Sequence, residues 1–316
     1  MKTKTLLFIA LCFSINVQGQ LKWKEVTNDF GITNTGVKVF ESVGTLNDSA
    51  FRAFYVQINT KDKSLNLGMD TTLYRRLTPL QFNERLNNPL VVVNASFFEF
   101  KNNTNVNVIV KEGKTVAYNL HNIAGKGKRD TLTYLHILGS AIGMTNHNKL
   151  DIGYTYTDSA LSKVYFQQEP LVPFRDSSAT LSLSNANLEK LKPWKVKWAV
   201  GGGPVLIRDA QIKISNEEER KFTGKGISDR HPRTAMGYTK KGELIIMAIQ
   251  GRMKGIAVGA TLGETAKLFL DLGCYEAINL DGGGSSCLLV NGKETIKPSD
   301  ATGERPVPAV FYVKQL

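Results

Sequence analysis

The chain has 316 residues, of which 42% are hydrophobic and 22% charged, with 40 Lys and Arg against 28 Asp and Glu. This composition excludes a disordered chain and a collagen-like fibre, and three cysteines are too few for a disulfide scaffold. A chain of this length can bury an ordinary hydrophobic core. The formal charge of +12 favours anionic partners, such as phosphate-bearing glycans, nucleic acid or acidic lipid, although a merely solvated basic surface would give the same balance.

Residues 1–19 have the pattern of a secretory signal peptide. A short basic start precedes an apolar run over residues 5–15, and small or neutral residues lead to a cleavage point before Gln20. A lipoprotein signal that lipidates Cys12 fits less well, because Leu11 stands where a small residue is needed. No later window has the roughly eighteen apolar residues of a transmembrane helix. We therefore expect an exported protein, periplasmic or extracellular, without a transmembrane segment.

The rest of the chain divides into residues 20–89, a β-rich segment, and residues 90–316, the main domain. Residues 51–58 alternate apolar and polar side chains, as a half-buried strand does. Residues 155–195 contain three prolines and are expected to form an irregular excursion. Further signals predict a buried strand at 90–93 and two hairpins, with strands at 106–110 and 115–118 and at 234–238 and 244–249.

The C-terminal third predicts one well-defined helix. Thr261 and Glu264 have the spacing of a capping box, and Gly273 is placed to end the helix. Many strands with few helices predict the α+β class, with mixed β-sheets and a few packed helices in a single large domain of catalytic type. Cys274 and Cys287 would lie out of register on adjacent strands, so we expect free, buried thiols.

The strongest chemical signal follows a predicted strand at 277–280. Asp281 at the end of that strand lies where ligands tend to bind, and glycine amides can approach an anion closely. A tight turn in which Asp281 caps its own backbone is the alternative, but it needs fewer glycines than this segment has. The segment continues with Gly282, Gly283, Gly284, Ser285 and Ser286.

Two further segments are candidates for the site. Arg230, His231 and Arg233 open a strand that continues with Thr234, and such residues can grip a phosphate and titrate near neutral pH, although a solvated basic loop would look the same. Asn94 and Glu99 flank two aromatic residues at another strand end, which could stack on a sugar or belong to the core. The other histidines lack metal-ligand spacing, so a zinc site is not predicted.

Read together, these motifs resemble the phosphodiester glycosidase family. The resemblance covers the chain from about residue 90 to its end, and Ser96 departs from the glycine that the family usually has there. The matching stretches are residues 93–98 (VNASFF), 200–204 (VGGGP), 230–235 (RHPRTA), 278–286 (INLDGGGSS), 298–300 (PSD) and 303–307 (GERPV).

The resemblance implies hydrolysis of a sugar-1-phosphodiester at the glycosidic bond. Asp281 would be the nucleophile or base, Glu99 or Glu304 the second carboxylate, and His231 a further catalytic group. The glycine amides with Arg230, His231 and Arg233 would hold the phosphate. The resemblance further assigns to substrate or phosphate binding Asn94, Gly202, Gly203, Thr234, Ser285, Ser286 and Arg305.

Other functions stay open on the sequence alone. The domain could bind a phosphorylated or acidic polysaccharide without turnover, or cleave the P–O bond as a phosphodiesterase does. Nucleic acid is not an expected partner, since no aromatic-basic recognition motif is present. No cofactor is required by the expected chemistry. One carboxylate at Asp281 does not argue for a divalent metal, and the sequence carries no signal for the oligomeric state.

Overall fold

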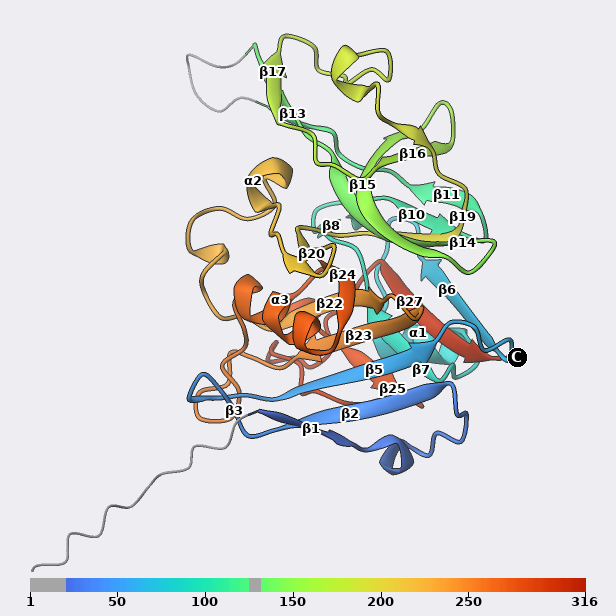
Figure 1. Cartoon of the computed structure of the whole chain (residues 1–316), viewed down its shortest axis with the longest axis vertical. Helices are drawn as coiled ribbons and strands as arrows, with labels where there is room; N and C mark the ends of the chain where they lie inside the picture. The colour runs from blue at the N-terminus through green and yellow to red at the C-terminus, as the bar shows by residue number, and fades with distance from the viewer. Residues whose placement is uncertain (1–20, 125–131) are drawn as a thin grey trace, which may run out of the picture.

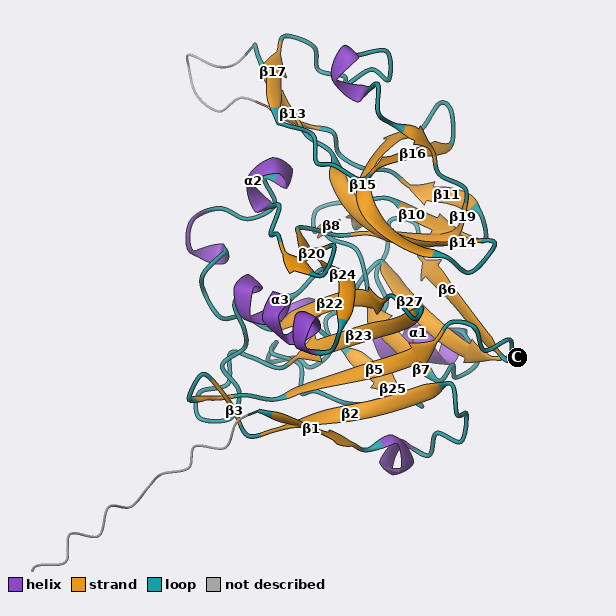
Figure 2. Ribbon diagram, in the orientation of Figure 1, coloured by secondary structure: helices purple, strands orange, loops and turns teal. Residues whose placement is uncertain are grey.

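The computed structural model describes residues 21–124 and 132–316, so the predicted signal peptide at 1–19 and the lipoprotein alternative at Cys12 lie outside the described residues. Strands predominate, and the few helices lie on the outside of the sheets (Figures 1 and 2). Within the described part of the chain, no helix is both long and apolar enough to cross a membrane.

The largest sheet has eight strands and forms the lower half of the molecule in Figure 1. In spatial order its strands are β1 (Lys22–Glu25), β2 (Val37–Val43), β5 (Ala53–Asn59), β23 (Glu243–Ile249), β22 (Arg233–Thr239), β24 (Cys274–Asn279), β20 (Val205–Arg208) and β21 (Gln211–Ile212).

Alternating side chains give this sheet two apolar faces. In β5, Phe54, Val56 and Ile58 join the main core, whereas Ala53 and Tyr55 face a second core. The second core is closed by α3 (Leu262–Asp271), which lies across the sheet (Figure 1). The sequence places α3 correctly, because Thr261 and Glu264 form the predicted capping box.

A five-stranded sheet packs on the other face of the eight-stranded sheet, and α1 (Pro79–Arg85) covers its outer side. Thr78 caps this helix, and Pro79 occupies its first turn, where a missing N–H costs nothing. The strands in order are β26 (Lys293–Glu294), β25 (Leu288–Val290), β7 (Val91–Asn94), β27 (Ala309–Gln315) and β6 (Leu65–Thr71).

A seven-stranded sheet forms the upper part of the molecule in Figure 1 and shares the main core. Its strands in order are β11 (Lys114–Ala117), β10 (Ile109–Lys111), β19 (Val196–Gly201), β14 (Gly139–Thr145), β15 (Leu150–Asp158), β16 (Lys163–Gln167) and β18 (Lys192–Pro193). The smaller elements are β12 (Asn122–Ala124), β13 (Tyr134–His136) and β17 (Phe174–Asp176) in one sheet, the pairs β3 (Thr45–Leu46) with β4 (Ser49–Ala50) and β8 (Phe98–Glu99) with β9 (Thr104–Asn105), and the short helix α2 (Asn216–Glu219).

The predicted α+β class with few helices is confirmed, but the sheets are not mixed as expected, because every strand pair among the described residues is antiparallel. Both predicted hairpins form, as β10–β11 and β22–β23. Cys274 and Cys287 are free and buried, as predicted.

The expectation of an irregular excursion at 155–195 is only partly correct. The range begins with the second half of β15 and contains β16, both regular members of the seven-stranded sheet. The reason is local: β-branched and aromatic residues fill 154–157 and favour a strand, whereas the three prolines all lie later, at 170, 173 and 193.

Candidate active site

Asp281 lies where strands of two different sheets end side by side. The chain leaves β24 of the eight-stranded sheet through Leu280, whose N–H donates to the carbonyl of Thr234 in β22 at 2.8 Å. The next N–H, of Asp281, donates at 3.1 Å to the carbonyl of Ala95, which follows β7 of the five-stranded sheet. The acidic residue is thus fixed by main-chain bonds from both sheets.

The side chain of Asn94, at the end of β7, holds this junction together. It is fully buried, and its Nδ2 donates to the main-chain oxygen of Asp281 at 2.6 Å. Its Oδ1 accepts from the hydroxyl of Thr234 at 2.8 Å and from the N–H of Cys287 at 3.0 Å. Asn94 and Thr234, both predicted to bind substrate, are therefore supports of the loop that carries Asp281, because their polar atoms are bonded within the protein.

The carboxylate of Asp281 is surrounded by donors and cations. Burial raises the pKa of this carboxyl to about 6, while a hydrogen bond from the Ser285 hydroxyl, the charge of Arg305, the N–H of Gly282 and the charge of Lys221 act in the opposite direction. At neutral pH the group is therefore mostly ionised, yet its pKa lies close enough to neutrality for proton exchange during a reaction.

Arg305 is held against the glycine loop. Its Nε and one terminal nitrogen donate to Asp300 at 2.7 and 3.0 Å, and the other terminal nitrogen reaches the Ser285 hydroxyl at 3.4 Å. A Cβ atom on Gly284 would overlap both Arg305 and Asp300, so only glycine leaves room for this ion pair. Arg305 and Ser285, both predicted to bind substrate, thus lie next to each other at the loop.

Lys221 supplies a second cation, and neither the motifs nor the resemblance had pointed to it. Burial lowers the pKa of its ammonium group, while the carboxylates of Glu219 and Asp281 act to raise it. Its ammonium nitrogen also lies 4.7 Å from the ring centre of Phe97. Glu219 is almost fully buried and accepts hydrogen bonds of 2.7 Å from the hydroxyls of Ser140 and Ser215.

Arg252 is a third cation at the loop, and it too was absent from the sequence-based set. A Cβ atom on Gly283 would lie 3.1 Å from a terminal nitrogen of Arg252, so the guanidinium rests against the loop. Arg252 also acts on His231. Burial and the charges of Arg233 and Arg252 lower the pKa of the His231 imidazole. His231 is thus near the loop but is disfavoured as a cation.

Two predicted phosphate ligands, Arg230 and Arg233, are committed elsewhere. Arg230 forms an ion pair with Glu264 of the capping box, with an Nε–Oε2 distance of 3.1 Å. Arg233 is buried and donates to the carbonyls of Ala260, Gly226 and Asp229. Their guanidinium groups tie the loop to α3 and to the preceding segment, so holding a phosphate would require them to give up these bonds.

The glycine amides are also less open than expected. The N–H of Gly283 donates to the carbonyl of Pro232 at 2.8 Å, and the N–H of Gly282 acts to lower the pKa of the Asp281 carboxyl. The amide of Gly283 is therefore already used within the protein. Gly202 and Gly203 donate to the carbonyls of Ser140 and Asn279, so their role is close packing. The Ser286 hydroxyl is buried without a partner among the described residues.

Both predicted second carboxylates are bonded to groups other than Asp281. Glu99 is exposed in β8, where it accepts from the N–H of Lys101. Glu304 accepts from the N–H of Leu80 at 2.8 Å, in the first turn of α1, and so acts as a helix cap. No group of three or more His, Cys, Asp or Glu side chains within residues 21–124 and 132–316 is arranged to hold a metal ion.

Comparison with known proteins shows to which family the chain belongs. The model of the phosphodiester glycosidase family matches residues 87–314. The chain belongs to this family. The N-acetylglucosamine-1-phosphodiester alpha-N-acetylglucosaminidase of Bos taurus is 33% identical over 106 residues, which are 33% of this chain and 20% of that relative. The aligned part thus spans about a fifth of the curated relative's length.

Two solved structures share the fold. The catalytic domain of the zebrafish N-acetylglucosamine-1-phosphodiester alpha-N-acetylglucosaminidase matches with a TM-score of 0.58 and 19% identity, over 94% of this chain and 83% of that one. A hypothetical protein from Synechocystis matches with a TM-score of 0.61 and 18% identity, over 92% of this chain and 63% of that one. The family expected from the sequence motifs is confirmed.

Proposed function

We propose that this protein is an exported hydrolase that cleaves the glycosidic bond of sugar-1-phosphodiesters, within a phosphorylated glycan or exopolysaccharide. The observation that carries the proposal is the environment of Asp281: burial raises the pKa of its carboxyl to about 6, Ser285, Arg305 and Lys221 act to lower it, and Arg305 reaches the Ser285 hydroxyl. Membership of the phosphodiester glycosidase family supports the same reaction class.

The chemistry explains why one carboxylate among cations is sufficient. When the bond between C1 and the oxygen breaks, the leaving group is a phosphate monoester with a second pKa of about 6. Such a group departs without strong general-acid help, so a second carboxylic acid beside Asp281 is not needed. The main demands are to neutralise charge on the phosphate oxygens and to meet the electron-poor sugar carbon.

Each demand has a group at the site. Arg305, Lys221 and Arg252 would neutralise the phosphate, with Arg305 held in place by Asp300. Asp281 would attack C1 or remove a proton from the attacking water. The water's oxygen then ends on the sugar, and the bridging oxygen leaves with the phosphate monoester.

Arg305 also belongs to a cluster of arginine and aromatic side chains. This cluster is suited to contact the aglycone, which is the group attached to the other side of the phosphate. The Phe100 ring is half exposed, and its centre lies 5.4 Å from the guanidinium carbon of Arg305 and 5.3 Å from that of Arg76. Arg76 also stacks over Phe98 at 5.5 Å. Such a surface offers an apolar face and fixed positive charge to a large anionic aglycone.

The proposal is tested by incubating purified protein with a panel of sugar-1-phosphodiesters in ¹⁸O-labelled water. We expect release of a phosphomonoester with the label on the sugar, and a loss of at least ~10²-fold in kcat/KM for Asp281→Asn. Label on phosphate would show P–O cleavage instead. Binding of every substrate without product after long incubation would favour the non-catalytic role.

A further inference from the structure

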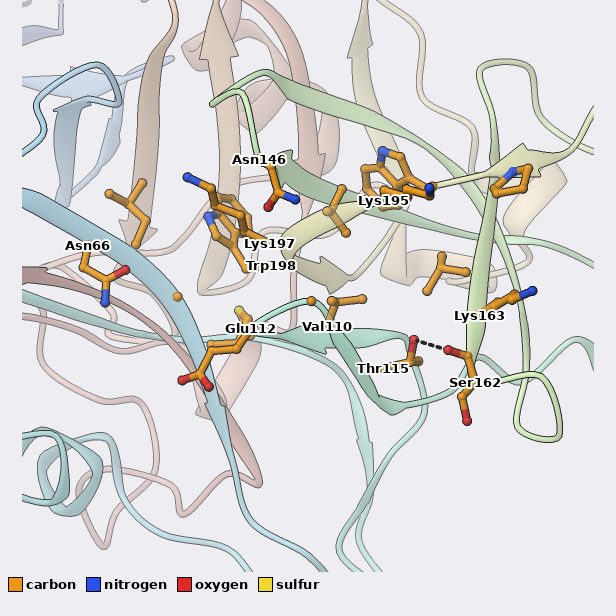
Figure 3. Close-up of a pocket in the computed structure, with 18 of the residues that line it drawn as sticks. Asn66, Val110, Glu112, Thr115, Asn146, Ser162, Lys163, Lys195, Lys197 and Trp198 are labelled. Atoms are coloured by element: carbon orange, nitrogen blue, oxygen red, sulfur yellow. Dashed lines mark hydrogen bonds between the residues drawn. The ribbon is translucent and has the colours of Figure 1, made fainter.

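A large cleft lies away from Asp281, between the five-stranded and the seven-stranded sheets. Its volume is about 670 Å³, and its walls come from β6, the β10–β11 hairpin, the ends of β16 and β18, and β19. Figure 3 shows the side chains around it, including Asn66, Glu112, Lys163 and Lys197. None of the residues that surround Asp281 lines this cleft.

The charge of the cleft is predominantly positive. Lys163, Lys195 and Lys197 line it, against a single carboxylate, Glu112. Neither Lys163 nor Lys195 forms an ion pair with any residue that the structure describes, and Lys197 donates to the side-chain oxygen of Asn148 at 2.9 Å. These ammonium groups therefore retain their capacity to bind an anion.

Aromatic side chains form another part of the wall. Trp194 is half buried and stacks on Phe166, with 4.6 Å between ring centres. Trp198 forms part of the floor, and its indole N–H is buried without an acceptor among the described residues. The cleft thus combines an aromatic surface, an unsatisfied donor and a few polar groups, which is the usual make-up of a ligand site.

We propose that this cleft binds an acidic oligosaccharide, independently of the site at Asp281. The lysines would pair with carboxylate or phosphate groups on the sugar chain. The Trp194 indole would pack on a sugar ring, and Glu112 with Asn66 and Asn146 would bond to hydroxyl groups. A single-stranded nucleic acid fits less well, because successive bases need several exposed rings to stack on.

The test uses the purified protein and a soluble oligogalacturonate as the acidic probe. A neutral dextran fragment tests whether charge is needed, and polyuridylate tests the nucleic-acid alternative. Binding is followed by tryptophan fluorescence, since two of the three tryptophans, Trp194 and Trp198, lie at the cleft. We expect oligogalacturonate to bind, with affinity that falls as salt is added. The double variant Lys163→Gln/Lys195→Gln should bind about tenfold more weakly, the loss expected for two exposed charge contacts.

A matched control is Lys22→Gln/Lys24→Gln, which removes the same charge from the edge strand β1 and should leave binding unchanged. Asp281→Asn should also leave it unchanged, so a failure of the proposed reaction does not affect this test. The proposal is overturned if the cleft variant binds as the wild type does, if the control loses as much, or if polyuridylate binds more tightly than oligogalacturonate.

Discussion

The side-chain amide of Asn94 donates a hydrogen bond of 2.6 Å to the main-chain oxygen of Asp281. The oxygen of this side-chain amide accepts hydrogen bonds from the hydroxyl of Thr234 and from the N–H of Cys287. Asn94 thus joins the end of β7 to β22 and to the loop at 281–287. This places the acidic loop before any substrate arrives and makes Asn94 a positioning residue.

The first prediction concerns this junction. Asn94→Ala should lower the free energy of unfolding by about 3 kcal/mol, because it leaves buried donors and a carbonyl without partners. Thr234→Val removes only one of these bonds and should cost about 1 kcal/mol. Chemical denaturation measures both values. Equal stability of Asn94→Ala and the wild type would show that the junction does not hold the loop.

The second prediction concerns the pH profile. Asp281 must be ionised to act, so kcat/KM should fall as the pH drops below about 6. The charge of Lys221 lowers the pKa of Asp281. Lys221→Met removes this charge, so the pKa should rise and the acidic limb of the profile should move to higher pH. The measurement is kcat/KM across the pH range.

Lys225→Met is the matched control for that shift. Lys225 is an exposed lysine of the same segment, and it does not contribute to the pKa of Asp281. Its removal should leave the limb in place. An equal shift of the acidic limb in both variants would mean that its position depends on the net charge of the protein and not on the charge of Lys221 in particular.

The sequence predicted the local parts of this site well and their mutual contacts poorly. The β22–β23 hairpin and the capping box of Thr261 and Glu264 depend on spacings of a few residues, which sequence patterns record. The partner of Arg230 lies 34 residues further along, and Glu264 was already explained by its role in the helix cap. Nothing in the local pattern indicated that the Glu264 carboxylate would also bind the guanidinium group of Arg230.

The missed cations have a similar cause. Lys221 and Arg252 lie outside every glycine-rich or strand-end motif, and they reach the loop only because separate segments fold against it. A count of basic residues gives the charge of the chain, but not which of them remain unpaired. Both Arg305 and Lys221 act to lower the pKa of the Asp281 carboxyl, although no motif links these two residues.

The third prediction separates the cations at the site from those predicted by motif. Arg305→Met should lower kcat/KM by about 10²-fold or more, because it removes a donor near the phosphate. Arg230→Met should leave kcat/KM within about threefold and lower the free energy of unfolding by about 1 kcal/mol, since Arg230 pairs with Glu264. The measurement is kcat/KM of both variants with the same phosphodiester. A larger loss of kcat/KM for Arg230→Met than for Arg305→Met would show that Arg230 is the phosphate ligand.

The fourth prediction concerns Gly284, where a methyl group would overlap the ion pair of Arg305 and Asp300. Gly284→Ala should displace the guanidinium, lower kcat/KM at least tenfold and destabilise the fold by about 1–3 kcal/mol, the usual cost of overpacking. Gly263→Ala is the control: it lies in α3, its nearest neighbour would be 3.9 Å away, and alanine favours a helix by about 1 kcal/mol. Gly263→Ala should thus be as active as the wild type and slightly more stable. Full activity in Gly284→Ala would mean that Arg305 does not need this position to serve the reaction.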